Sequence, residues 1–151
     1  MILVDTNIVG RVIQTAHRHH QAAVDAMTHL ATVAGEDFGI SVHSLYELYF
    51  IMTKPQPSGF GYAPRQAGVE LVNAQNLYQL LPETLNVYHI WQGLVGKYAL
   101  GNRAVFDAKI VATAIENKVP TLLTFNDTDF QEFTEITTLN PFDLLGIPRI
   151  P

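Results

Sequence analysis

The chain begins Met1-Ile2-Leu3-Val4-Asp5-Thr6-Asn7, and this short stretch sets the architecture that we expect. Ile2, Leu3 and Val4 form an apolar run that is typical of a strand buried on both faces. The run ends on Asp5, a carboxylate that would be costly in an apolar core without a partner. We therefore expect the strand to place Asp5 at its carboxyl end, where open α/β sheets bind ligands. Capping of the following helix is the alternative, because Asp, Thr and Asn all cap helices well.

The composition is that of a globular domain. Of the 151 residues, 48% are hydrophobic and 15% are charged, which suits one domain with a sizeable core. The net charge of −5 argues against binding nucleic acid through a broad basic surface, although a small basic rim around an acidic cleft remains compatible with it. The absence of cysteine excludes disulfides, cysteine-ligated zinc and thiol nucleophiles. No signal peptide or membrane span is evident, so we expect a cytoplasmic protein without a membrane partner.

Helical and strand patterns alternate along the chain. Helical periodicity predicts helices over 8–13, 23–35, 42–53, 65–80, 87–98 and 104–118. Short apolar runs predict further strands over 37–42, 80–81, 121–126 and 135–139. The helix over 42–53 is apolar on nearly every face and is therefore expected to be buried. Strands separated by helices favour a three-layer α/β/α fold with a mainly parallel sheet of four to five strands.

The helix expected over 104–118 gives the strongest physical signal for a functional carboxylate. Its core-facing stripe, at the helical spacing of three and four residues, consists of Asp107, Ile110, Val111, Ala114 and Ile115. The side chains expected to face outward are Lys109, Thr113, Glu116 and Asn117. A carboxylate in the first turn also favours the helix dipole, so capping is the alternative for Asp107. That alternative is weakened because Asn102 offers a cap further upstream.

The remaining acids have simple explanations when each is taken alone. Glu47, within the helix over 42–53, would pair with an arginine or reach solvent. Asn126, Asp127 and Asp129 follow an apolar run and could form a turn or a cap. Together, however, these acids fall at element ends that a parallel sheet brings to one edge, where converging carboxylates repel one another unless a cation is present. Mg²⁺ or Mn²⁺ binds oxygen ligands and would support hydrolysis of a phosphodiester.

Residues 1–7, 44–48 and above all 101–130 (GNRAVFDAKIVATAIENKVPTLLTFNDTDF) resemble PIN-domain ribonucleases of the VapC toxin type. The resemblance extends in order over nearly the whole chain. It implies a PIN-like three-layer fold and a single domain over 1–151, with a C-terminal tail at 141–151. It also implies an Mg²⁺- or Mn²⁺-dependent endoribonuclease that is the toxin of a toxin–antitoxin pair. RNA would be the substrate, and an apolar surface on the early helices would bind an antitoxin and a second copy in a homodimer.

The same resemblance assigns roles to the acidic positions. Asp5 and Asp107 become metal ligands and Glu47 the third catalytic acid, while Thr6 and Asn7 match residues that brace Asp5.

The fourth acidic position departs from the fullest pattern, because Asn126 stands where the family frequently has Asp. Either Asn126 serves through its carbonyl oxygen or a water, or Asp127 or Asp129 supplies the charge; we count Asp127 with the catalytic acids. Phosphate contacts to RNA are expected from basic residues near the motifs, with solvated surface as the alternative for each. These residues are Arg11, Lys54 and Arg103.

Two other functions fit parts of the pattern. A catalytically silent PIN domain that binds RNA or protein would accord with Asn126 and with the net negative charge. A phosphohydrolase with Asp5 as nucleophile fits less well. Haloacid-dehalogenase-like phosphatases need an Asp where Asn7 stands, and no clear lysine follows a later strand as receiver domains require.

Overall fold

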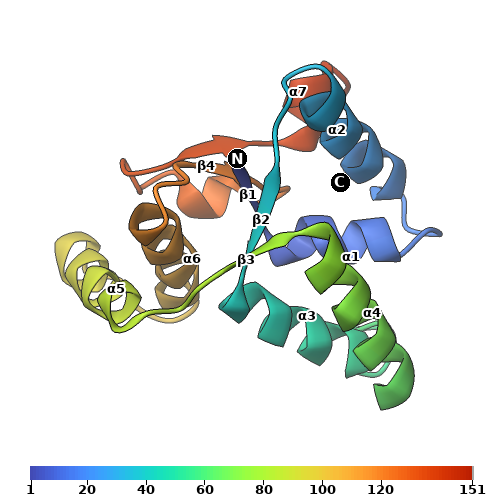
Figure 1. Ribbon diagram of the computed structural model, residues 1–151, viewed down its shortest axis with the longest axis horizontal. Helices are drawn as coiled ribbons and strands as arrows, with labels where there is room; N and C mark the ends of the chain where they lie inside the picture. The colour runs from blue at the N-terminus through green and yellow to red at the C-terminus, as the bar shows by residue number, and fades with distance from the viewer. Residues whose placement is uncertain (151) are drawn as a thin grey trace.

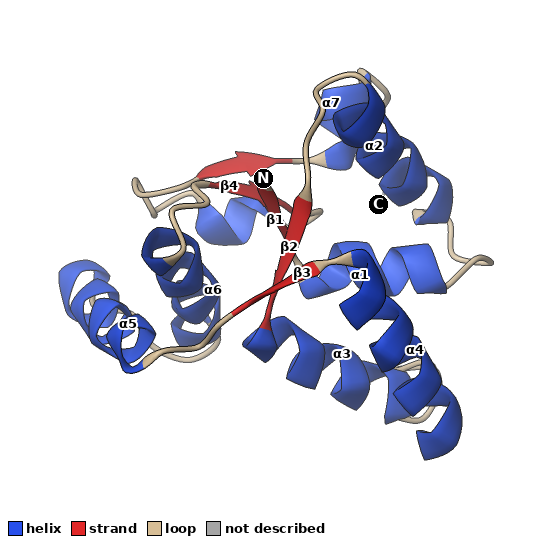
Figure 2. Ribbon diagram, in the orientation of Figure 1, coloured by secondary structure: helices blue, strands red, loops and turns tan. Residues whose placement is uncertain are grey.

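A parallel sheet runs through the middle of the computed structural model, which describes residues 1–150 (Figure 2). Its strands are β1 (Ile2–Val4), β2 (Phe38–Ser41), β3 (Gln79–Leu81), β4 (Thr121–Leu123) and β5 (Thr137–Leu139). They lie in the order β3-β2-β1-β4-β5, and all neighbouring strands pair in parallel. The first strand is therefore central, and the carboxyl ends of all five strands point to one edge of the sheet.

Helices cover both faces of this sheet (Figure 1). The helices are α1 (Thr6–Ile13), α2 (His20–Thr32), α3 (Val42–Thr53), α4 (Pro64–Leu77), α5 (Leu85–Tyr98), α6 (Ala104–Glu116), the 3₁₀ turn η1 (Asp127–Phe130) and α7 (Pro141–Leu145). Helices α5 and α6 lie on one side of the sheet, whereas α1, α2, α4 and α7 lie on the other (Figure 1). The three-layer α/β/α fold with a parallel sheet of five strands is thus confirmed.

Successive side chains of β1 point alternately into the hydrophobic cores on the two faces of the sheet. Ile2 and Val4 belong to the core beneath α1–α4, whereas Leu3 belongs to the core beneath α5 and α6. Leu122 and Leu123 of β4 divide between the same two cores. Because successive side chains of a strand point to opposite faces, a central strand with helices on both sides must be apolar throughout. The apolar run that opens the sequence meets this requirement.

The expectation that α3 is buried on every side is wrong. Ser44, Leu45, Leu48 and Met52 are its buried residues, whereas Tyr46 is 67% exposed and Phe50 is 61% exposed. A helix in an outer layer needs only one apolar stripe against the core, so the other apolar side chains of α3 remain on the surface.

Three smaller differences have local causes. Thr113 is buried, not outward-facing, because its hydroxyl donates to the backbone oxygen of Lys109 at 3.0 Å and needs no water. Asn102 adopts a left-handed φ of 53° and is not the cap of α6, whose N-cap position is Arg103. The segment expected as a tail starts with α7, capped by Asn140.

Among the described residues, no helix has the length and apolar character needed to cross a membrane.

Candidate functional site

Asp5 lies where β1 ends and α1 begins, with only 6% of its surface exposed. It occupies the N-cap position of α1, but its side chain makes no capping hydrogen bond. Instead, its Oδ2 atom accepts hydrogen bonds from Asn7 Nδ2 at 2.7 Å and from Thr124 Oγ1 at 2.6 Å. The carboxylate is therefore held by two side chains at the carboxyl ends of β1 and β4, an orientation that capping does not explain.

Asn7 joins these two strand ends. Its Nδ2 atom also donates to Thr124 Oγ1 at 3.0 Å, and its Oδ1 atom accepts from the Phe125 backbone at 3.1 Å. Thr124 is fully buried, and its hydroxyl also accepts from the Asn126 backbone at 3.0 Å. Thr124 was not among the residues predicted to support the site, although a hydroxyl directly after an apolar strand would have been the available signal.

Glu47 reaches the same region from α3. Thr6 Oγ1 donates to Glu47 Oε2 at 2.7 Å, and the Glu47 residue is exposed. The hydroxyl of Thr6, which the resemblance assigned to Asp5, thus holds Glu47 instead. Thr6 directly follows Asp5 in the chain, so its side chain leaves the backbone in a different direction and meets α3.

These acids line one cavity of about 200 Å³. Its polar lining residues are Asp5, Thr6, Asn7, Arg11, His43, Glu47, Asp107, Asn126 and Asp129. Asp107, in the first turn of α6, and Asp129, in η1, therefore join Asp5 and Glu47. Four segments far apart in the sequence thus contribute carboxylates to one concavity at the carboxyl edge of the sheet.

Burial and mutual repulsion disfavour ionisation of two of these acids. Burial raises the pKa of Asp5 to about 6, helped by the negative charges of Glu47 and Asp107, while the hydrogen bond from Thr124 opposes the rise. The pKa of Asp107 is also raised to about 6, first by burial and then by the charges of Asp129 and Glu47. Raised pKa values of neighbouring carboxylates are characteristic of sites that bind a cation or transfer a proton.

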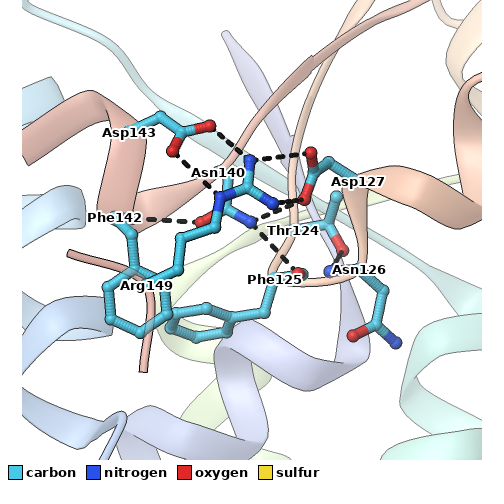
Figure 3. A network of polar contacts seen from close by, with 8 residues as sticks. All are labelled: Thr124, Phe125, Asn126, Asp127, Asn140, Phe142, Asp143 and Arg149. Atoms are coloured by element: carbon cyan, nitrogen blue, oxygen red, sulfur yellow. Dashed lines mark hydrogen bonds and ion pairs between the residues drawn. The ribbon is translucent and has the colours of Figure 1, made fainter. Parts of the chain in front are cut away.

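Asp127, the first residue of η1, is not among the residues that line the acidic cavity. Its carboxylate accepts from Arg149 Nη2 at 2.9 Å and from Asn140 Nδ2 at 2.6 Å (Figure 3). Asn126 and Asp129, on either side of it in the chain, do line the cavity. Of the candidates for the fourth acidic position, the structure therefore brings Asn126 and Asp129 to the other acids and directs Asp127 elsewhere.

The three basic residues singled out in the sequence gather around a neighbouring hollow. Arg11, Lys54 and Arg103 all line this concavity of about 420 Å³. It shares Arg11 and Glu47 with the acidic cavity. The acids are thus adjoined on one side by basic side chains.

An aromatic pair stands at the mouth of the acidic cavity. The rings of His43 and Phe106 are stacked, with centroids 5.9 Å apart and planes 4° from parallel. Both residues line the cavity, and Phe106 is largely exposed. Helices α3 and α6 therefore contact each other beside the cavity through these two rings.

The donor set suits a hard divalent cation. Carboxylates, with the hydroxyl and amide oxygens beside them, are the ligand types that Mg²⁺ and Mn²⁺ prefer. Among the described residues, no group of three or more His, Asp or Glu side chains is arranged so that it could hold a metal ion together. Mg²⁺ is commonly held by only one or two carboxylates and keeps several waters, so the Asp5 and Asp107 carboxylates fit such an ion.

Comparisons with known proteins agree with this fold. Residues 2–136 match the model of the PIN domain family. No curated protein shows significant similarity to the chain.

The fold is shared with several solved structures. VapBC2 from Rickettsia felis, bound to a DNA fragment from its promoter, aligns with a TM-score of 0.68 at 19% identity, covering 93% of this chain and 98% of that chain. VapBC-1 from Haemophilus influenzae aligns with a TM-score of 0.66 at 18% identity, with the same coverage. Mycobacterium tuberculosis VapC20, a toxin described as cleaving the sarcin-ricin loop, aligns with a TM-score of 0.60 at 15% identity, covering 90% and 98%.

Proposed function

The chain belongs to the PIN domain family, and we propose on this premise that it is an Mg²⁺- or Mn²⁺-dependent endoribonuclease, the toxin of a VapBC-type pair. The observation that supports this most strongly is the convergence of Asp5, Glu47, Asp107 and Asp129 on one cavity. Like charges gathered in one concavity repel one another, so they favour binding of a divalent cation. Such a toxin would act in the cytoplasm.

Each acidic residue has a distinct part in this proposal. Asp5, oriented by Asn7 and Thr124, and Asp107, in the first turn of α6, would hold the ion. When bound, a divalent cation lowers the pKa of a water and neutralises charge that develops on the phosphate. Glu47, which accepts a hydrogen bond from Thr6, would accept the proton of the attacking water. The water oxygen would bond to phosphorus as the bond from phosphorus to the leaving sugar oxygen breaks.

Asp129 is our candidate for the fourth acid. Its charge is the second-largest contribution to the raised pKa of Asp107, after burial. The two carboxylates are thus near enough to interact, and Asn126 lines the cavity beside them. Asp127 instead has a structural part, because Arg149 and Asn140 engage its carboxylate.

The basic rim supports RNA as the substrate. Arg11, Lys54 and Arg103 would contact phosphates on one side of the scissile bond. The exposed Phe106 ring, stacked on His43, offers a face on which an unpaired base can stack. A single strand would thus pass along the hollow and over the acids.

The exposed apolar side chains of α3 and α4 support protein partners. Tyr46 and Phe50 on α3, and Val69 and Val72 on α4, are all more than half exposed. Helices α3 and α4 pack against each other, and large exposed apolar patches commonly mark interaction sites. We propose that this side of the molecule binds an antitoxin and a second copy of the chain. Likeness in fold to VapBC structures supports the antitoxin as partner.

Cleavage of single-stranded RNA by the purified protein tests the proposed function. We expect cleavage with Mn²⁺ or Mg²⁺, none with EDTA, and none by Asp5→Asn at any metal concentration. Asp37→Asn, which removes one negative charge from an exposed position, is the matched control and should cleave normally. RNA binding without cleavage by the wild-type protein would instead favour a catalytically silent PIN domain.

A further inference from the structure

Arg149, in the segment after α7, bridges two acidic residues from different parts of the fold (Figure 3). Its Nη1 and Nη2 atoms donate to the two carboxylate oxygens of Asp127 at 3.0 and 2.9 Å. Its Nε atom donates to Asp143 Oδ1 at 3.0 Å, and its Nη2 atom also contacts Asp143 Oδ2. The guanidinium therefore engages both carboxylates through two bonds each, an arrangement with strict geometric requirements.

Asp127 transmits this contact to the loop between β4 and η1. Asn140 Nδ2 donates to Asp127 Oδ1 at 2.6 Å and to the Phe125 backbone oxygen at 3.1 Å. Partial burial would raise the pKa of Asp127, but the hydrogen bonds from Arg149 and Asn140 lower it below its ordinary value. Asp127 is thus held in its charged form by two partners on the side of the loop away from the cavity.

The residues on either side of Asp127 lie on the side of the cavity. Asn126 and Asp129 both line it, and the Asp129 backbone nitrogen donates to the Asn126 oxygen at 3.0 Å. On the inner side, the Asn126 backbone nitrogen donates to Thr124 Oγ1, the same hydroxyl that orients Asp5. The loop is therefore fastened from within by Thr124 and from outside by Arg149, with the cavity-lining side chains between these two attachments.

The exposure of Arg149 limits what its ion pairs can do for overall stability. Its side chain is 45% exposed, and that of Asp143 is 59% exposed. Exposed ion pairs contribute little to the free energy of unfolding. Their effect here is instead local, because they restrict a short segment whose Asn126 and Asp129 side chains line the cavity.

We propose that Arg149 is a positioning residue for the acidic site: through Asp127, it holds the β4–η1 loop so that Asn126 and Asp129 face Asp107. This inference rests on the proposed function, since it assumes that the cavity binds a divalent cation. It makes the segment after α7 a part of the site, although that segment lies outside the 2–136 match to the family.

The test compares Arg149→Met with Arg149→Lys, which keeps the charge but not the paired geometry. Arg65→Met, which removes an equivalent exposed charge from α4, is the matched control. Mn²⁺ binding is measured directly from the electron paramagnetic resonance signal of the free ion. Amide hydrogen exchange of residues 124–130 in the metal-free protein reports on the loop itself.

We expect Arg149→Met to weaken Mn²⁺ binding about three- to tenfold, less than the ~10–100-fold typical when a direct support of a ligand is lost. Arg149→Lys should lie between Arg149→Met and the wild type, Arg65→Met should match the wild type, and exchange should accelerate in 124–130 but not in α4. The double variant Asp127→Asn/Arg149→Met should bind Mn²⁺ as Asp127→Asn does, because Arg149 acts through Asp127.

Two results would overturn the proposal while leaving the proposed function intact. One is wild-type Mn²⁺ affinity in Arg149→Met, whether or not the loop exchanges faster. The other is an additive loss in the double variant, which would mean that Arg149 acts on the site by another route. A wild-type protein that binds no Mn²⁺ would overturn the proposed function and this inference with it.

Discussion

Replacing Asp5 by asparagine should stabilise the metal-free protein at neutral pH, even though it removes a proposed metal ligand. The pKa of Asp5 rises from 3.8 to about 6, chiefly because the side chain is buried. At about 1.36 kcal/mol per pKa unit, ionised Asp5 destabilises the folded state by about 3 kcal/mol. An asparagine carries no charge, and its amide oxygen can still accept the hydrogen bond from Thr124. Asn7 donates to the same Oδ2 atom, so this oxygen can accept both hydrogen bonds in the variant and the gain should approach this figure.

The sign of the pH dependence follows from the same shift. Asp5 binds its proton more tightly in the folded than in the unfolded protein, so its favourable contribution is complete below about pH 3.8. That contribution is lost as the pH rises through about 6. The stability advantage of Asp5→Asn should therefore be small near pH 4 and reach its full value above about pH 7.

Thermal unfolding in EDTA measures this effect. For a chain of this length, about 1 kcal/mol corresponds to roughly 2–4 °C in Tm, so Asp5→Asn should gain up to about 6–12 °C at neutral pH. Added Mn²⁺ should raise the Tm of the wild type but not of Asp5→Asn. Asp37→Asn serves as the control: its Tm in EDTA should match that of the wild type, and Mn²⁺ should raise its Tm equally. The raised pKa of Asp5 is refuted if metal-free Asp5→Asn is less stable than the wild type at neutral pH, or if their difference does not change with pH.

Three further predictions concern cleavage and RNA binding. Glu47→Gln should slow cleavage by about 10²–10⁴-fold with Mn²⁺ binding largely retained, measured by single-turnover kinetics at saturating metal; equal losses of both would place Glu47 among the ligands. Thr124→Val removes the hydrogen bond that lowers the pKa of Asp5, so the acid limb of the pH–rate profile should move to higher pH; an unmoved limb would contradict this. Lys54→Ala should weaken RNA binding and reduce the slope of log affinity against log salt by about 1, without changing the cleavage rate of bound RNA.

The spacing of apolar residues along the chain predicted much of the fold. The uninterrupted apolar run of β1 predicted a strand buried on both faces, and helical spacing in α6 predicted the burial of Ile110 and Val111. Both inferences depend on periodicity within one element, which a sequence displays directly. The parallel order then follows, because helices separate the strands.

The parts that could not be predicted depend on partners distant in the chain. The Thr6 hydroxyl bonds to Glu47, 41 residues away, and not to Asp5. Asp127 turns away from the cavity because Arg149, 22 residues later, engages it. The local sequence could not separate Asp127 from Asp129, since both follow the same strand and both lie in η1.

The most direct test of the acidic site is anomalous diffraction from a crystal of the wild-type protein soaked in Mn²⁺. We expect a manganese peak in the cavity, coordinated by the carboxylates of Asp5 and Asp107, and no such peak in Asp5→Asn. A manganese ion bound elsewhere, or a cavity that stays free of manganese in the wild type while its RNA is cleaved, would contradict the assignment of these two residues as metal ligands.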